Sequence, residues 1–119
     1  ARLDWNLDGL PDVAVNHLTT PASLVLNQTS AVGRSLRVQL IGTTSPRTPI
    51  GATVDVHTDR GVVRKQLLAG DGYMASNERT LFFGLGAAAH IERIEVRWPS
   101  GRQSTYRIEP FAATAQIIE

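Results

Sequence analysis

Oxygen-bearing side chains recur at every second position near the start of the chain, in the segment from residue 4 to residue 12. Two aspartates and an asparagine alternate with apolar residues, Gly9 follows them, and a third aspartate closes the segment. Calcium takes about six to eight oxygen ligands, and a tightly curled loop with a glycine at its reversal can supply them. Carboxylates this close together repel one another unless a cation lies between them. The sequence therefore predicts a calcium-binding loop with side-chain ligands Asp4, Asn6, Asp8 and Asp12 and the backbone carbonyl of Leu10.

Two other interpretations of this loop remain open. Magnesium demands near-ideal octahedral geometry and keeps several of its waters, so it suits a flexible loop less well than calcium does. The other interpretation is a solvated acidic turn that binds no metal.

The rest of the chain carries no catalytic constellation. The three histidines are far apart and lack the spacing of metal ligands, and His57 is expected on the surface. Gly84-Leu-Gly86 lacks the lysine and the hydroxyl residue of a phosphate-binding loop, and no Gly-x-Ser-x-Gly motif is present. Glu92 and Glu95 stand beside arginines, which favours surface ion pairs over an acid–base pair. The sequence thus predicts that the protein is not an enzyme.

Aromatic side chains offer an alternative function, because an exposed ring could stack on a sugar. Packing in the core or in a turn is expected for Trp98 and Tyr106, whereas Trp5 and Tyr73 are open to either role. A carbohydrate-binding β-sandwich, with Trp5, Tyr73 or Trp98 against the sugar, is therefore the alternative to a protein-interaction module.

Composition limits the class of protein. The chain has 119 residues, 42% of them hydrophobic and 19% charged, as expected for one soluble globular domain. It has no cysteine, so disulfides and cysteine-based zinc sites are excluded. No apolar run approaches the roughly 20 residues that cross a bilayer, which predicts no membrane insertion. Eleven of the twelve basic residues are arginines that form no run, and we expect no nucleic-acid partner. The chain begins at Ala1, and we expect a piece of a longer protein.

Short stretches with a period of two indicate β-strands throughout. Apolar and polar residues alternate most clearly at 36–40, 52–56, 62–68, 80–85, 91–98 and 104–108, with shorter candidates at 13–15, 23–27 and 112–118. Thr58 to Gly61 and Trp98 to Arg102 predict hairpin turns, and 73–79 is expected to be irregular. No segment has a persuasive helical period.

These strands predict an all-β fold, an antiparallel β-sandwich or barrel of about seven to eight short strands. The inward positions of the strands predict a core of Leu36, Val38, Leu40, Val54, Val56, Leu67, Phe83, Leu85, Ile94, Val96, Trp98, Tyr106 and Ile108.

Two family patterns are visible in these residues. Asp4-x-Asn6-x-Asp8-Gly9-x-x-Asp12 followed by Val-Ala-Val resembles the calcium loop of an FG-GAP repeat, the unit of integrin-α-type β-propellers. Residues 36–106 resemble the ASPIC/UnbV domain, which is known from cartilage acidic protein and from secreted bacterial proteins. The matching stretches are Leu36 to Gly42, Ser45-Pro-Arg47, Ile50 to Val54, Gly70-Asp-Gly-Tyr73, Phe83-Gly-Leu-Gly86 and Val96-Arg-Trp-Pro-Ser-Gly101.

The resemblance implies an FG-GAP remnant at residues 1–30 and an ASPIC/UnbV-like β domain at residues 31–119. It implies a non-catalytic interaction module that follows a β-propeller in an extracellular, periplasmic or cell-envelope protein. The expected partners are that N-terminal propeller and an unidentified protein or glycan. An exposed strand edge on the remnant could also pair with a second copy to form a dimer.

Overall fold

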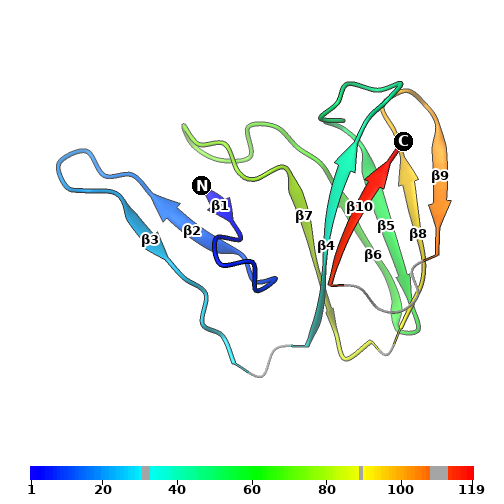
Figure 1. Ribbon diagram of the computed structural model, residues 1–119, viewed down its shortest axis with the longest axis horizontal. Helices are drawn as coiled ribbons and strands as arrows, with labels where there is room; N and C mark the ends of the chain where they lie inside the picture. Colours follow the sequence, from blue (N-terminus) through cyan, green and yellow to red (C-terminus); the bar gives the residue numbers. More distant parts are fainter. Residues whose placement is uncertain (31–32, 89, 108–112) are drawn as a thin grey trace.

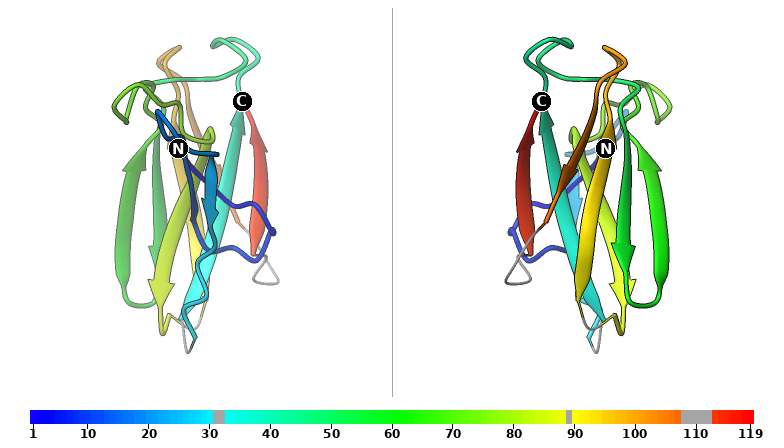
Figure 2. Two further views of the ribbon diagram at one scale, coloured as in Figure 1. Left: turned by 90° about the vertical axis from the view of Figure 1, so that its left-hand side faces the viewer. Right: turned by 90° about the vertical axis from the view of Figure 1, so that its right-hand side faces the viewer.

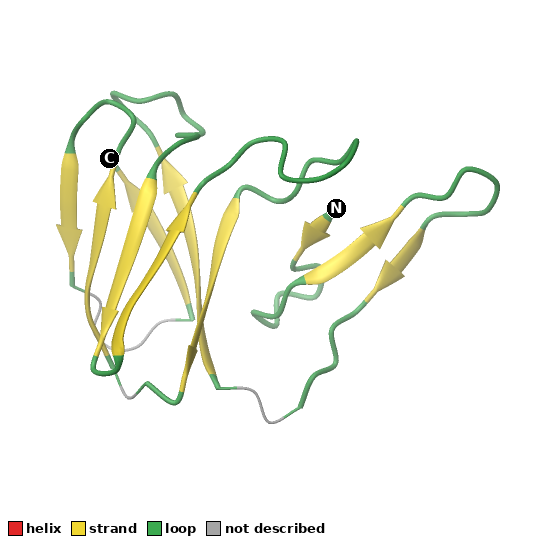
Figure 3. Cartoon of the chain, turned by 180° about the vertical axis from the view of Figure 1, so that it is seen from behind, coloured by secondary structure: helices red, strands yellow, loops and turns green. Residues whose placement is uncertain are grey.

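The computed structural model describes residues 1–30, 33–88, 90–107 and 113–119, and within these ranges it contains ten strands in three small sheets and no helix (Figures 1 and 3). The first sheet has the order β1-β2-β3, from β1 (Arg2–Leu3), β2 (Asp12–Val15) and β3 (Ser23–Val25). The second has the order β10-β4-β7, from β10 (Thr114–Ile118), β4 (Arg34–Ile41) and β7 (Thr80–Gly86). The third has the order β6-β5-β8-β9, from β6 (Gly61–Gln66), β5 (Thr53–Thr58), β8 (Ile91–Arg97) and β9 (Gln103–Tyr106). The all-β prediction is confirmed.

The second and third sheets pack face to face as a sandwich of seven strands, and the axes of their strands are roughly aligned in both views of Figure 2. One core joins them, with Phe83 of β7 and Val38 of β4 on one side and Val56 of β5 and Ile94 of β8 on the other. Every predicted core residue that the structure describes is buried except Tyr106, which is partly buried and packs against the core. Ile108 lies outside the described residues.

The strand register explains why the alternation of apolar and polar residues correctly predicted which side chains face the core. Val54 and Val56 of β5 stand opposite Val96 and Ile94 of β8, so apolar partners point into the core together. The intervening residues of both strands point to the outer face of the sandwich.

The sandwich is antiparallel as predicted except at one edge. β10 runs parallel to β4, with Thr114 opposite Arg37 and Ile118 opposite Ile41. Alternation sets which face a side chain occupies, but it is the same for either strand direction, so sequence periodicity could not distinguish the two arrangements.

The three-stranded N-terminal sheet stands to one side of the sandwich (Figure 1). The radius of gyration is 15.4 Å, whereas a compact chain of this length would have about 13.5 Å. Several apolar side chains of this sheet are exposed, among them Val13, Val15, Leu24 and Val25. Residues 73–79 are irregular as predicted, with a turn at Tyr73 and Met74. None of the described segments forms a helix long and apolar enough to span a membrane.

Candidate metal centre

The loop between β1 and β2 contains four of the five predicted calcium ligands, the fifth, Asp12, is the first residue of β2, and the loop closes around the carboxylate of Asp4. The backbone N–H groups of Asp8 and Gly9 donate to the two Asp4 oxygens, each at 3.1 Å. Gly9 has a φ of +85°, a left-handed conformation that a side chain would strain, and an added Cβ would lie 3.2 Å from the Ser35 hydroxyl of β4. The sharp reversal expected at Gly9 is therefore present, and it lies against the sandwich.

Asp12, at the far end of the loop, is fully buried and holds both ends of the N-terminal segment together. Its two carboxylate oxygens accept the backbone N–H groups of Trp5 and Asn27, both at 2.8 Å. The Asn27 hydrogen bond is the main cause that lowers the pKa of Asp12, and it outweighs the opposing effect of burial. Asp12 is thus held as an ionised carboxylate.

The middle of the loop faces solvent. The side chains of Asn6 and Asp8 are exposed, and the Asn6 amide donates to Asp8 at 2.8 Å. The other Asp8 oxygen accepts the backbone N–H of Leu10 at 2.8 Å. These contacts fold the loop without using the remaining lone pairs of the carboxylates, so the oxygen donors suit a hard cation such as calcium.

In this structure the carboxylate oxygens of Asp4, Asp8 and Asp12 do not all lie within 4.8 Å of one another. A calcium ion would therefore need the exposed part of the loop to close further. Calcium binding by Asp4, Asn6, Asp8, Leu10 and Asp12 stays a prediction.

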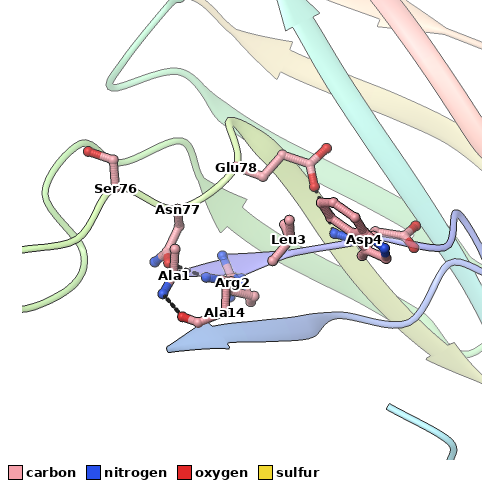
Figure 4. A pocket seen from close by; sticks show the side chains of 9 residues that line it. Ala1, Arg2, Leu3, Asp4, Ala14, Ser76, Asn77 and Glu78 are labelled. Atoms are coloured by element: carbon pink, nitrogen blue, oxygen red, sulfur yellow. Dashed lines mark hydrogen bonds between the residues drawn. The ribbon is translucent and has the colours of Figure 1, made fainter. Parts of the chain in front are cut away.

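Two residues that the sequence analysis did not single out attach this loop to the sandwich. Glu78, just before β7, accepts the Asp4 backbone N–H at 3.0 Å (Figure 4). Arg37 of β4 pairs with Glu78 and lies 3.5 Å from Asp4. Burial raises the pKa of Glu78, but hydrogen bonds from Thr80, from Asp4 and from Arg37 outweigh it and lower the pKa overall. Glu78 and Arg37 are distant from the loop in sequence, and no local pattern marks them.

Further contacts attach β1 to the same surface. The Arg2 backbone N–H donates to Asn77 at 2.6 Å, and its carbonyl accepts the Glu78 backbone N–H at 2.9 Å. The guanidinium groups of Arg2 and Arg37 each lie 5.9 Å from the ring centre of Phe82, a distance at which cation–π attraction operates. The N-terminal sheet is therefore docked on the sandwich by β1 and its loop.

A second cluster of metal-ligand residues lies on the outer face of the sandwich. The cluster consists of Asp55 and His57 of β5 and Glu95 of β8. Each of these residues has one possible ligand atom within 4.8 Å of those of the other two. An imidazole nitrogen and two carboxylates are donors that a divalent cation can use. His57 faces outward as expected, although only 16% of its side chain is exposed, and its Nε2 atom makes no hydrogen bond but lies 3.4 Å from a carboxylate oxygen of Glu95.

Arginines already neutralise the carboxylates of this cluster. Arg64 donates two hydrogen bonds to Asp55, of 2.6 and 2.8 Å, and Arg97 donates a third at 3.1 Å. Arg64 is the main cause that lowers the pKa of Asp55. Arg93 donates to Glu95 at 2.7 Å, in line with the ion pairs predicted there. A cation would have to compete with three guanidinium groups, so an ion-pair network accounts for this cluster.

The aromatic residues considered for sugar stacking divide into two groups. Trp98 is buried in the core, as expected, and its indole N–H donates to Ser104 at 3.0 Å, so it is not available for the alternative role of stacking on a sugar. Trp5 is 65% exposed and lines a cavity of about 380 Å³ between β1 and residues 76–78 (Figure 4). Tyr73 is 94% exposed and lines a different cavity of about 810 Å³ beside β2.

Comparison with known protein families gives one match. The profile of the family described as ASPIC and UnbV matches residues 42–119, about two thirds of the chain. This range covers six of the seven strands of the sandwich and begins just after β4. No match to the chain was found among curated proteins.

Proposed function

Because the chain belongs to the ASPIC and UnbV family of non-catalytic modules, we propose that it is an extracellular or cell-envelope interaction module whose N-terminal loop binds calcium. In this proposal residues 1–30 are the end of an FG-GAP repeat, and the sandwich is the module that follows a β-propeller. Its ligand is a protein or a glycan.

The observation that carries the proposal is the position of the loop between the two parts of the chain. Asp4 belongs to the predicted ligand set and also contacts Glu78 and Arg37 of the sandwich. A cation held by Asp4 would therefore order the N-terminal sheet and its docking surface together. Ligands that bind the folded state but not the unfolded state stabilise the whole structure.

The outer edge of β3 supports the assignment of the N-terminal sheet to a propeller blade. The sheet order β1-β2-β3 places β1 and β3 at the edges, but the Arg2 backbone of β1 already bonds to Asn77 and Glu78, whereas all three residues of β3 are exposed. Exposed strand edges pair readily with further strands. A strand of the propeller would occupy the β3 edge in the parent protein, and a second copy of the chain could occupy it in isolation.

A calorimetric calcium titration of the chain tests this proposal. We expect one calcium ion to bind in the wild type and binding to be lost in Asp8→Ala, because Asp8 is exposed and supplies a ligand without supporting the core. Glu92→Ala is the matched control, since it removes an exposed acid of β8, outside the loop, and should leave the affinity unchanged. Binding that survives Asp8→Ala, or no binding by the wild type, would contradict the proposal.

A second candidate, carbohydrate binding, is favoured by one observation only. Tyr73 is exposed beside the larger cavity, which Val15 and Leu18 also line. Aromatic rings on such a surface can stack on sugars. A glycan array with wild type and Tyr73→Ala checks this candidate: a ligand that binds the wild type and is lost in the variant would support it, and no ligand would rule it out.

A further inference from the structure

The side chain of Glu119, which directly follows β10, is enclosed by hydrogen-bond donors from two separate connections of the sandwich. Its Oε2 atom accepts three successive backbone N–H groups, those of Thr43 at 3.1 Å, Thr44 at 3.0 Å and Ser45 at 2.6 Å. Its Oε1 atom accepts the hydroxyls of Ser45, at 3.1 Å, and Ser100. The carboxylate thus receives five hydrogen bonds, and no ion pair joins it to a cationic side chain among the residues that the structure describes.

Successive backbone N–H groups that point at one position form a concave anion site known as a nest. The nest is built by the connection after β4, which closes tightly on itself: the Gly42 N–H donates to the Arg47 carbonyl at 3.1 Å. A Cβ atom on Gly42 would lie 2.2 Å from the Pro46 carbonyl oxygen, so only glycine allows this closure. The nest therefore depends on local backbone geometry and not on Glu119 alone.

The hydroxyl of Ser45 has a fixed direction. Ser45 is buried, and its oxygen accepts the Ser100 backbone N–H at 3.1 Å, so its proton is directed to Glu119. Ser100 in turn lies in the β8–β9 turn, where the Trp98 carbonyl accepts the Gly101 N–H. Ser45 and Ser100 belong to the Ser45-Pro-Arg47 and Trp98-Pro-Ser-Gly101 motifs, and neither motif is part of the predicted calcium loop.

The nest joins the two sheets of the sandwich. Residues 43–45 follow β4 of one sheet, Ser100 follows β8 of the other, and Glu119 directly follows β10. Arg102 adds a positive charge at the rim, because its guanidinium donates to the Thr44 hydroxyl at 3.1 Å. Without the Glu119 carboxylate, five donors would converge on a position with no acceptor, and such unpaired groups are costly.

We propose that residues 42–45 and Ser100 form a carboxylate-binding site, that the Glu119 side chain is its resident ligand, and that this ligand latches β10 and the two sheets together. A free monocarboxylate can enter the same site when the Glu119 carboxylate is removed. Electrostatics agree with this assignment: burial raises the pKa of Glu119, but the Ser100 hydroxyl and the backbone N–H groups of Ser45 and Thr43 outweigh it and lower the pKa to about 2.

Chemical rescue tests the proposal. Melting temperatures are measured at neutral pH in sodium acetate and in sodium chloride of equal ionic strength, for the wild type, Glu119→Ala and the double variant Glu119→Ala/Ser45→Ala. We expect Glu119→Ala to melt several degrees below the wild type, and acetate to restore part of this loss. The gain from acetate over chloride should be smaller in the wild type, whose site is filled, and in the double variant, whose site lacks a donor.

Two results would overturn the proposal. One is a Glu119→Ala variant that melts like the wild type, and the other is an equal gain from acetate in all three proteins, which would be a general salt effect. If Glu119→Ala does not fold, Glu119→Gln serves in the same comparison, because it keeps the side-chain length and one acceptor oxygen. Glu92→Ala controls for the loss of an acidic residue elsewhere.

Discussion

Asp55 on β5 is the carboxylate most completely enclosed by arginines in the described structure. Its side chain is only 4% exposed, and Arg64 and Arg97 satisfy both oxygens, although the arginines themselves reach into solvent. The ionised form is favoured because the hydrogen bonds from Arg64 exceed the cost of burial. Outward-facing polar residues of a β-sheet can therefore be as strongly constrained as core residues.

We predict that Asp55→Asn lowers the free energy of unfolding by about 1–3 kcal/mol at neutral pH, the range for hydrogen bonds to charged groups. The pKa of Asp55 in the folded protein lies below its ordinary value of 3.8. The carboxylate thus stabilises the fold above that pH, and the contribution is lost as pH falls through the folded-state pKa. Denaturant unfolding of both proteins across this range should show the difference shrink in acid.

Glu92→Gln is the control for Asp55→Asn, because Glu92 is exposed on β8 and makes only a loose ion pair with Arg93 at 3.8 Å. We expect it to change stability by less than about 0.5 kcal/mol. Equal stability of Asp55→Asn and the wild type at neutral pH would show that the arginine network contributes nothing.

At the scale of elements, β10 completes the sandwich although it lies at an edge. Ile117 points into the core and is buried, whereas its neighbour Ile118 is 53% exposed. The Tyr106 hydroxyl of β9 donates to the Ile118 carbonyl at 2.8 Å, so β10 is also tied to the opposite sheet. Together with the Glu119 latch, these contacts make β10 part of the cooperative fold.

Ile117→Ala should lower the free energy of unfolding by about 2–4 kcal/mol, because it removes buried methyl groups and leaves a cavity. Ile118→Ala, a matched truncation one residue along the same strand, should cost less than about 0.5 kcal/mol. Denaturant unfolding of the two variants provides the comparison. Similar losses in both would mean that β10 does not pack against the core.

The strands and turns that could be predicted well are those determined by residues close together in the sequence. Alternation placed Val54, Val56, Ile94 and Val96 on the inner faces of paired strands, and Thr58 to Gly61 formed the expected hairpin turn. The parallel direction of β10 escaped prediction because periodicity carries no direction. His57 lies on the outer face as predicted, but its low exposure could not be predicted, because alternation separates the two faces of a strand and does not show that neighbouring side chains cover its outer face.

The contacts around the candidate sites could not be predicted from the sequence, for a different reason. Arg37 and Glu78 reach Asp4 only after β4 and β7 have paired, and their spacing in sequence carries no sign of this. The carboxylate nest uses backbone N–H groups, which every residue except proline possesses, so the chemistry of Thr43 and Thr44 is invisible in the side-chain sequence. The reversal at Gly9 could be predicted because the loop motif lies within nine residues, whereas calcium binding by the loop stays a prediction.

At the scale of the whole molecule, the N-terminal sheet and the sandwich share one docking surface, formed by β1, its loop and residues 77–78. The sandwich has a continuous core, but the N-terminal sheet exposes Val13, Val15 and Val25 and depends on β1, Asp4 and the neighbouring loop for its attachment. Parts with few buried contacts open first. The surface around Glu78 should therefore control whether the N-terminal sheet stays attached.

Limited proteolysis of the wild type and Glu78→Ala tests this control. We expect cleavage between residues 28 and 35 to be faster in the variant, by about tenfold for each 1.4 kcal/mol of docking free energy lost. The sandwich should stay intact in both proteins. Mass spectrometry of a time course gives both the site and the rate. Identical rates in the two proteins would mean that Glu78 does not hold the sheet in place.

The measurement that tests the central claim most directly is the melting temperature of the whole chain in calcium and in chelator, with magnesium as the control cation. The account predicts one cooperative transition that moves to higher temperature in calcium, since a ligand at about 100 times its Kd adds roughly 2.7 kcal/mol. Asp8→Ala should abolish the shift. A melting temperature that is the same in calcium and in chelator would contradict a calcium loop coupled to the fold through Asp4, Glu78 and Arg37.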